Sequence, residues 1–325
     1  MKTDTPIPFE AFMRHALHDP QRGYYAKRIP GVGARGDFTT APMLSDAPAR
    51  AIAAWAARAM QETGCHNLIE IGPGEGRLAA AVRKHLPWSL RWRVSLHLVE
   101  TSAPLREAQQ KLLGRKARWH EHPTEALAEC QGKAVIFSNE LVDAFPVRRF
   151  YKTDAGWQEM AVAISVSGQV EESLLPPAPL PDSSVFSQAP STYPPGQIVE
   201  VHESYQRWQQ EWLPSWKQGR SLTIDYGSTV DRLYHRRPRG TLRAYLMQQR
   251  LEGYDIYQNI GRQDLTADIN FTDLMHWSSP LMEEQKLCSF REFLTIHNSS
   301  PTPDWMDEGG VGEAFLVLDE KRRAR

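Results

Sequence analysis

The residues with the clearest chemical potential form a glycine-rich loop after a short apolar run. Residues 68–71 read LIEI and residues 72–76 read GPGEG. Gly72 and Gly74 can adopt backbone torsions that a side chain would forbid, so a ligand can approach the main chain there. Gly76 lets the helix that follows pack closely on a sheet. The pattern predicts a binding site for a nucleoside-containing cofactor at the carboxyl end of a parallel strand.

Acidic side chains indicate which cofactor this loop would hold. The dinucleotide fingerprint is G-x-G-x-x-G, whereas this loop is G-x-G-x-G, and Glu70 and Glu75 would repel a pyrophosphate. A zwitterionic sulfonium with an amino-acid tail suits this charge better. The next apolar run ends at Glu100, 28 residues after Gly72, where a carboxylate can accept hydrogen bonds from both ribose hydroxyls. We therefore predict S-adenosylmethionine as the cofactor, bound by Glu70, Gly72, Pro73, Gly74, Gly76, Glu100 and Thr101. A plain turn with Glu100 on the surface is the alternative.

A second polar cluster follows a later apolar run that ends at residue 138. It contains Asn139, Glu140 and Asp143. Polar groups after a buried strand are costly unless they bind a ligand or cap a helix. A carboxylate can hold a guanidinium through two parallel hydrogen bonds, so we predict that Glu140 orients the methyl acceptor and that Asp143 assists. A helix cap made by Asn139 or Asp143 is the alternative.

The elements that would position these residues alternate between strand and helix. Strands are predicted at 67–71, 94–100, 117–120 and 133–138, with helices at 75–86 and 104–113. This alternation predicts an α/β fold, a Rossmann-like and mostly parallel twisted sheet with helices on both faces. Upstream, helices are predicted at 9–17 and 48–62. Downstream, we expect a hairpin of 147–152 with 158–165, a proline-rich loop at 176–196, strands at 221–225 and 314–318, and an irregular region at 240–285. Trp208, Trp212 and Trp216 are expected on one core-facing helix stripe.

This pattern divides the chain into two parts. Residues 1–66 are expected to be an N-terminal, largely helical extension that contributes to the active site. Residues 67–325 are expected to be the catalytic domain, with α+β insertions around 147–220 and 228–285.

Composition narrows the class of protein. Of 325 residues, 38 are Lys or Arg and 39 are Asp or Glu, and the net charge of −1 provides no global field for nucleic acid. The three cysteines are an odd number without a Cys-x-x-Cys pair, which disfavours disulfides and a cysteine metal site. We find neither a secretory leader nor a run of about 18 apolar residues, so we expect a cytoplasmic protein without a membrane span. The triplet 120–122 (HEH) has no third ligand at helical spacing, so we expect an exposed turn and no metal there.

Further motifs extend along nearly the whole chain. They are FEAFM at 9–13, GYY at 23–25, GDFTTAP at 36–42, the loop 70–76, Glu100 with Leu105, Arg106 and Gln109, then Asn139, Glu140, Asp143 and Pro146, DYG at 225–227, GTLRAY at 240–245 and DLTA at 264–267. With them the chain resembles the MidA-like family of class I S-adenosylmethionine-dependent methyltransferases. The mitochondrial member of that family is a complex I assembly factor that methylates an arginine of a complex I core subunit.

The resemblance implies a role for each matching residue. Gly72, Gly74, Gly76 and Glu100 would line the cofactor site. The loop residues and the strand-end pair would close over the cofactor near the transferred methyl; these are Gly36, Asp37, Phe38, Thr39, Thr40, Pro42, Asn139 and Glu140. Asp37 and Tyr24 are further catalytic candidates. The implied activity is arginine methylation of a protein substrate, with a respiratory-complex subunit as one candidate.

Three positions depart from the family pattern. Met43 stands where the family usually has Glu, and Gln248 and Asp268 stand where it usually has His. These changes support an alternative function, an assembly or binding protein that keeps the cofactor fold with reduced catalysis. A nicotinamide-dependent oxidoreductase ranks below both, because the third glycine comes one residue early.

Overall fold

The computed structural model describes residues 3–26, 45–165, 169–187, 193–247, 249–297 and 314–324. The chain forms two compact units. The sheet unit comprises Pro30–Leu141, Gln209–Tyr226 and Ser278–Arg325, and the antiparallel unit comprises Met1–Ile29, Val142–Trp208 and Gly227–Trp277.

The sheet unit contains the α/β fold expected from the strand–helix alternation. Its strand order is β15-β16-β10-β5-β2-β3-β4. The pairs β10–β5, β5–β2, β2–β3 and β3–β4 are parallel, whereas β16 runs antiparallel to β10 and β15 antiparallel to β16. The strands are β2 (Asn67–Ile71), β3 (Ser95–Val99), β4 (Arg118–His120), β5 (Val135–Asn139), β10 (Arg220–Ser228), β15 (Met282–Ser289) and β16 (Phe315–Arg322).

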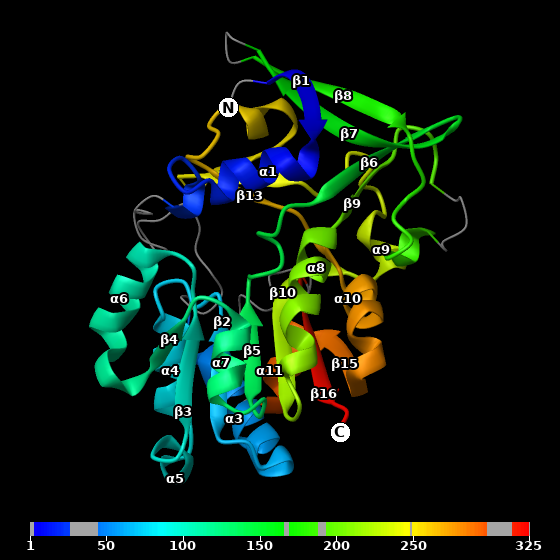
Figure 1. Cartoon of the computed structure of the whole chain (residues 1–325). Coiled ribbons are helices and arrows are strands. Elements are labelled where there is room, and N and C mark those ends of the chain that lie inside the picture. Colours follow the sequence, from blue (N-terminus) through cyan, green and yellow to red (C-terminus); the bar gives the residue numbers. More distant parts are fainter. Residues whose placement is uncertain are drawn as a thin grey trace. The chain divides into compact units, whose positions relative to one another are not determined.

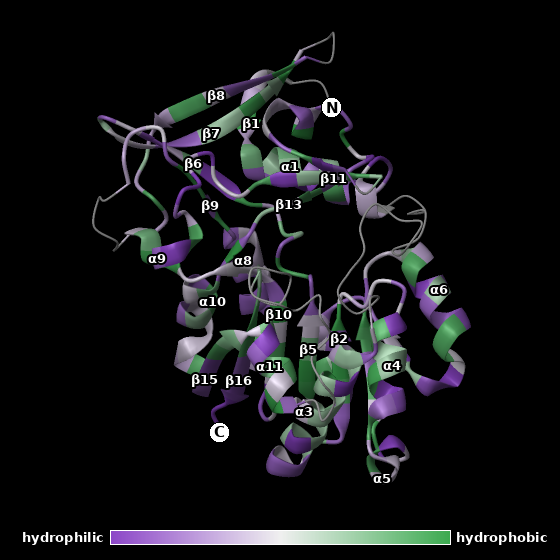
Figure 2. Ribbon diagram, turned by 180° about the vertical axis from the view of Figure 1, so that it is seen from behind, coloured by the Kyte–Doolittle hydropathy of each residue, from purple (hydrophilic) through white to green (hydrophobic). Residues whose placement is uncertain are grey.

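Helices cover both faces of this sheet. Helix α7 (Pro123–Glu129) lies in front of it in Figure 1, and α4 (Arg77–His85) and α11 (Phe290–His297) lie in front of it in the reverse view of Figure 2. The remaining helices are α3 (Ala47–Thr63), α5 (Trp88–Arg91) and α6 (Ala103–Leu113), with 3-10 turns at Gly114–Lys116, Leu213–Ser215 and Ser279–Leu281. Strands β2, β3, β5 and β10 are buried along most of their length, whereas β4 and β15 are partly exposed.

The core of the sheet unit includes helix α3 and the central part of β5. Small side chains along α3, among them Ala49, Ala53 and Ala56, are buried against the helices and strands around them. Helix α3 ends at Gly64, which takes the left-handed conformation at φ 70° that terminates many helices. Phe137 is fully buried at the centre of β5, two residues before the polar cluster. Packing of this ring therefore holds the strand that carries Asn139.

The antiparallel unit contains two further sheets. The first has the order β1-β7-β6-β9, with β8 also pairing β7, and the second has the order β12-β11-β13. These strands are β1 (Thr3–Pro8), β6 (Arg148–Thr153), β7 (Gly156–Ile164), β8 (Val170–Pro177), β9 (Ile198–Val201), β11 (Arg243–Leu246), β12 (Gln249–Leu251), β13 (Asp264–Thr266), with β14 (Ile269–Asn270) pairing β10. Its helices are α1 (Phe9–His18), α8 (Glu203–Trp212, whose last turn belongs to the sheet unit), α9 (Val230–Leu233) and α10 (Phe271–Ser278), with 3-10 turns at Tyr24–Ala26, Val185–Ser187 and Gly253–Tyr257.

Several local expectations are confirmed and several are wrong. The hairpin is confirmed, since β6 and β7 pair through the turn at Gly156. The region 240–285 is not irregular: it holds β11 to β14, α10 and the start of β15. The tryptophan stripe is broken, because α8 ends at Trp212 and the buried Trp216 follows a 3-10 turn. Helix α7 was not expected from the sequence.

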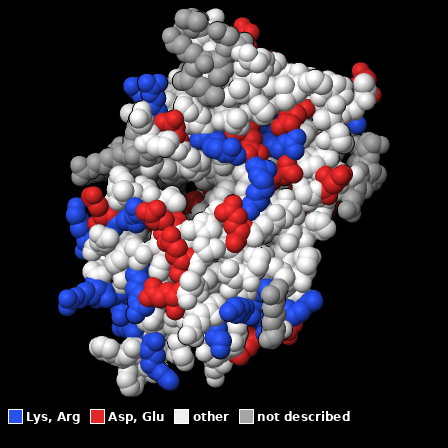
Figure 3. Space-filling view, in the orientation of Figure 1, with Lys and Arg blue, Asp and Glu red and all other residues white. Residues whose placement is uncertain are grey.

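The surface carries charges of both signs, as the nearly equal numbers of acidic and basic residues predict. On the face drawn in Figure 3, acidic and basic side chains lie next to one another in several mixed groups. Among the described residues, we find no helix with the length and apolarity needed to cross a bilayer.

We expect Phe137→Ala to lower the free energy of unfolding by about 3–5 kcal/mol, because it leaves a cavity at the centre of the parallel strands. Urea denaturation followed by circular dichroism measures the change. Leu112→Ala on α6 is the control, since 49% of that side chain is exposed and its loss should cost far less. Equal losses for the two variants would contradict this account of the core.

Candidate functional site

The glycine loop follows the end of β2 directly. Its three glycines all have positive φ: 68° at Gly72, 53° at Gly74 and 80° at Gly76. The Gly72 N–H donates to the Val99 carbonyl at 3.0 Å, which ties the loop to the neighbouring strand β3. A Cβ on Gly72 would lie 2.7 Å from Leu141 Cδ1, whereas a Cβ on Gly74 would have no described atom within 4 Å. The backbone at Gly74 therefore faces open space within the described part of the chain.

Gln109 fixes the far end of this loop. Its Nε2 donates to the Gly74 carbonyl at 2.6 Å, and its Oε1 accepts from Trp119 Nε1 at 3.0 Å. A Cβ on Gly76 would come within 3.1 Å of Gln109 Cγ, so glycine is required for α4 to pack this closely against α6. Pro73 closes the turn by accepting from the Gly76 N–H at 2.8 Å. Gln109 is fully buried, and the cofactor residues expected from the loop pattern did not include it.

Glu70 is the last residue but one of β2, just before the loop, and its carboxylate is buried. Its side chain is 2% exposed, and its Oε2 has no hydrogen-bond partner among the described residues. Burial raises the pKa of Glu70 to about 8, and the nearby Glu100 adds to the rise. A buried carboxylate without a counter-charge is costly, so this position favours a bound cation such as an ammonium group.

Glu100 follows β3 and points inward. Its residue is 9% exposed, and Oε1 accepts from the Ser102 N–H at 2.8 Å. Burial raises the pKa of Glu100 to about 7, opposed by hydrogen bonds from the Ser102 and Thr101 backbones and from the Gln109 side chain. Glu100 is therefore buried and not on the surface as in the alternative, and its role in binding the ribose stays a prediction. The Thr101 backbone donates one of the hydrogen bonds to Glu100, and Thr101 itself is exposed.

Asn139 and Glu140 extend β5 next to the loop, since Ser138 is the register partner of Ile71 on β2. Glu140 has φ 50°, an unfavourable conformation for this residue type, and its N–H donates to the Ile224 carbonyl at 2.9 Å. Asn139 Nδ2 donates to Glu140 Oε1 at 3.0 Å, while Asn139 Oδ1 has no partner among the described residues. The two side chains form one polar unit at the strand end.

Asp225 holds this strand end in place. It is fully buried on β10, and its two carboxylate oxygens accept from the Leu141 N–H at 3.1 Å and from the Tyr226 N–H at 2.9 Å. This role explains why an acid lies in the DYG motif. The sequence predicted no role for Asp225 beyond its place in that motif.

The other catalytic candidates that the structure describes belong to the antiparallel unit. Asp143 is 8% exposed, accepts from Thr266 Oγ1 at 2.8 Å, and has a pKa raised by burial. Tyr24 is buried with its ring 5.1 Å from the ring of Tyr25, whose hydroxyl donates to Asp264 Oδ1 at 3.0 Å. The motif GYY is therefore joined to DLTA by the hydrogen bond from Tyr25 to Asp264. DLTA is in turn joined to Asp143 by the hydrogen bond from Thr266.

Asp268, one of the three departures from the family pattern, has its charge balanced internally. Its carboxylate pairs with Arg243 and Arg237, and its N–H donates to Thr241 Oγ1 at 2.9 Å. The remaining expected site residues lie outside the described residues; they are Gly36, Asp37, Phe38, Thr39, Thr40 and Pro42, as are the departures Met43 and Gln248.

The pKa of Glu70 predicts a pH-dependent stability of the cofactor-free protein. Its pKa is about 8 in the fold against 4.5 for an ordinary glutamate, so between these values the folded state binds more protons than the unfolded state. The carboxyl therefore makes stability fall as pH rises through that window. Glu70→Gln should be increasingly stabilised relative to wild type from pH 5 to pH 8, measured by urea denaturation. A stability difference independent of pH would contradict this, and the exposed Glu107→Gln is the control.

Solved structures share this fold. One from Burkholderia thailandensis, bound to S-adenosyl-homocysteine, is 24% identical, with a TM-score of 0.83 over 98% of this chain and 88% of that one. A native crystal structure of an uncharacterized protein from the same organism is 25% identical, with a TM-score of 0.81 over 98% of this chain and 87% of that one. The likeness establishes the class I methyltransferase fold.

Curated relatives are named as mitochondrial protein arginine methyltransferases. The chain is 28% identical over 311 residues to the mitochondrial protein arginine methyltransferase NDUFAF7 homolog of Drosophila melanogaster, covering 83% of this chain and 66% of that protein. It is 27% identical over 312 residues to NDUFAF7 of Homo sapiens, covering 84% and 66%. The chain thus spans slightly less than two thirds of the length of these relatives.

A family model described as "Putative S-adenosyl-L-methionine-dependent methyltransferase" matches residues 51–285, which include the glycine loop, Glu100 and the strand-end pair. With its α/β sheet and cofactor loop in place, this chain belongs to that methyltransferase family, the MidA-like family, whose cofactor is S-adenosylmethionine.

Proposed function

We propose that this protein transfers a methyl group from S-adenosylmethionine to an arginine side chain of a protein substrate. The observation that carries the proposal is the buried, unpartnered Oε2 of Glu70 beside the open backbone of Gly74. The curated relatives named as protein arginine methyltransferases support the acceptor class. A respiratory-complex subunit remains a candidate substrate.

The residues at the carboxyl end of the sheet fit this cofactor. Glu70 would face its ammonium group, which supplies the missing counter-charge. Glu100 would accept hydrogen bonds from the two ribose hydroxyls. Gly72, Pro73, Gly74 and Gly76 would form the wall along its amino-acid tail, and Asn139 Oδ1, without a partner among the described residues, offers one more acceptor.

The chemistry requires positioning more than activation. The bound sulfonium supplies an electrophilic methyl group, which a nitrogen lone pair displaces in line. Glu140 would bind the acceptor guanidinium through charge-assisted hydrogen bonds and hold one nitrogen toward the methyl. Its left-handed backbone and its hydrogen bond from Asn139 restrict where that carboxylate can lie. Asp143, Tyr24 and Asp37 stay further candidates that the sequence predicts for holding the acceptor.

The altered family positions bear on the alternative of a non-catalytic assembly protein. Asp268 is held by two arginines, so it serves the packing of its own unit. Binding of S-adenosylhomocysteine without methyl transfer to any arginine-bearing protein would favour the assembly role, and tight binding of NADH would favour the oxidoreductase.

Glu100→Ala should weaken binding of S-adenosylhomocysteine by about 10–100-fold, because about 1.5–3 kcal/mol is lost with hydrogen bonds to a charged acceptor. Calorimetric titration measures the affinity. The control is Glu107→Ala on α6, an exposed acid seven residues away in sequence. Unchanged affinity in Glu100→Ala would remove the ribose assignment.

Glu140→Gln should reduce methyl transfer by roughly 100-fold or more while leaving the affinity for S-adenosylhomocysteine within a few-fold of wild type. The assay follows labelled methyl groups into lysate proteins and identifies methylarginine after hydrolysis. Glu107→Gln should behave as wild type. Undiminished turnover in Glu140→Gln would rule out the acceptor role, and label in another residue type would rule out arginine as the substrate.

A further inference from the structure

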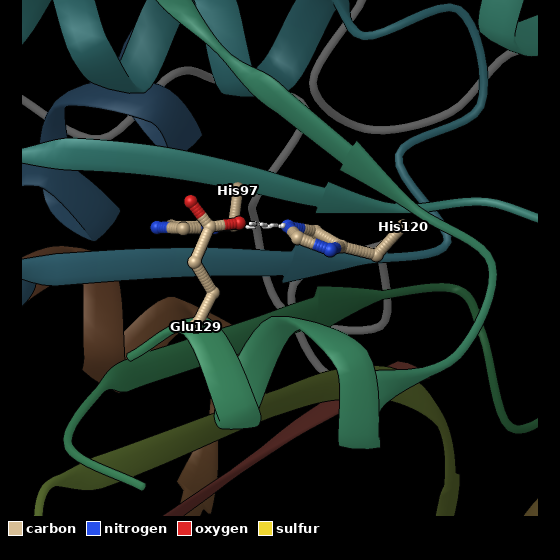
Figure 4. Close-up of side chains that lie close together, drawn as sticks. All are labelled: His97, His120 and Glu129. Carbon is tan, nitrogen blue, oxygen red and sulfur yellow. Dashed lines mark hydrogen bonds and ion pairs between the residues drawn. The ribbon is translucent and has the colours of Figure 1, made fainter. Parts of the chain in front are cut away.

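Two histidines lie side by side in the sheet unit, on neighbouring parallel strands. His97 is in β3 and His120 ends β4, and both side chains face the end of α7 (Figure 4). His97 Nδ1 lies 3.0 Å from His120 Nε2, and the ring centroids are 5.2 Å apart at an interplanar angle of 24°. His97 is 1% exposed and the His120 side chain 9%, so His120 does not lie in the exposed turn that the HEH triplet suggested.

A third group comes from a helix that the sequence pattern did not indicate. Glu129 is the last residue of α7, and its Oε2 lies 3.6 Å from His120 Nε2. The potential ligand atoms of His97, His120 and Glu129 all lie within 4.8 Å of one another. The sequence lacked a third ligand at helical spacing, whereas the fold supplies one across a strand–helix contact.

The spacing suits a transition metal. Zinc binds nitrogen and carboxylate oxygen at about 2.0–2.2 Å, so ligand atoms in a tetrahedral site lie roughly 3.3 Å apart. The separations of 3.0 and 3.6 Å bracket that value. We propose that His97, His120 and Glu129 form a zinc-binding site, in which water completes the coordination.

The groups around the three ligands support this assignment. Cys130 Sγ lies 3.5 Å from His97 Nε2 and can accept its N–H, which leaves the lone pair of Nδ1 facing the cluster. Arg118 pairs with the other oxygen of Glu129 and orients that carboxylate.

The site would stabilise the part of the sheet that carries Glu100. The Glu100 N–H donates to the His120 carbonyl at 3.0 Å, so β4 braces the end of β3. An ion held by β3, β4 and α7 would fix this edge of the sheet. Glu129 is the exposed member, with 39% of its side chain accessible, and leaves a route for the ion and for a water ligand.

We expect the full chain, freed of metal by chelation, to bind one equivalent of Zn²⁺ with an accompanying rise in thermal stability. Binding is measured by calorimetry, and bound Co²⁺ should show the intense visible absorption of four-coordinate cobalt. Glu129→Gln and His120→Gln should each weaken Zn²⁺ binding by roughly tenfold or more, and Glu129→Gln changes only an exposed side chain. Glu125→Gln, an exposed acid on the same helix outside the cluster, is the matched control.

Three outcomes would overturn the proposal. They are the absence of stoichiometric Zn²⁺ binding, affinities in both ligand variants equal to wild type, and equal loss of affinity in the Glu125→Gln control. The readouts are affinity, absorption and thermal stability, so the result stands apart from whether the protein methylates arginine.

Discussion

A buried carboxylate without a counter-charge is the constraint around which the sheet unit is organised. Glu70 lies at the tip of β2, where burial opposes its charge. Under the proposed function, the space at Gly74 would admit a ligand that brings positive charge to this carboxylate. A hydrophobic residue at the same position would remove the cost of burying this charge and, under the proposed function, the partner of the cofactor's ammonium group.

Sheet topology brings the other residues predicted to bind the cofactor to the same edge of the sheet as that carboxylate. From β2 the chain moves outward to β3 and β4 and then returns to the opposite side of β2 with β5. The strand order therefore reverses beside β2, which is where open α/β sheets bind ligands. The loop after β2, Glu100 after β3 and the Asn139–Glu140 pair after β5 all follow from this one reversal.

Sequence patterns predict the structural features that depend on residues close together in the chain. The glycine loop, the parallel strands and the inward Glu100 follow from torsion, burial and alternation within a few residues. Gln109 and Asp225 could not be assigned roles this way, because each acts on backbone groups distant in sequence. The short strands β11 to β13 were missed for the same reason, since their pairing depends on partners rather than on alternation. The His97–His120–Glu129 cluster likewise exists only once β3, β4 and α7 are assembled.

The backbone at Glu140 has an evolutionary consequence. A left-handed conformation favours glycine or asparagine over glutamate, and holding a non-glycine residue there costs of order 1 kcal/mol. A population of variants selected only for thermal endurance would drift away from glutamate at this position. Under the proposed function, a population selected for methyl transfer would retain it, so the residue at position 140 would record which demand has governed the lineage.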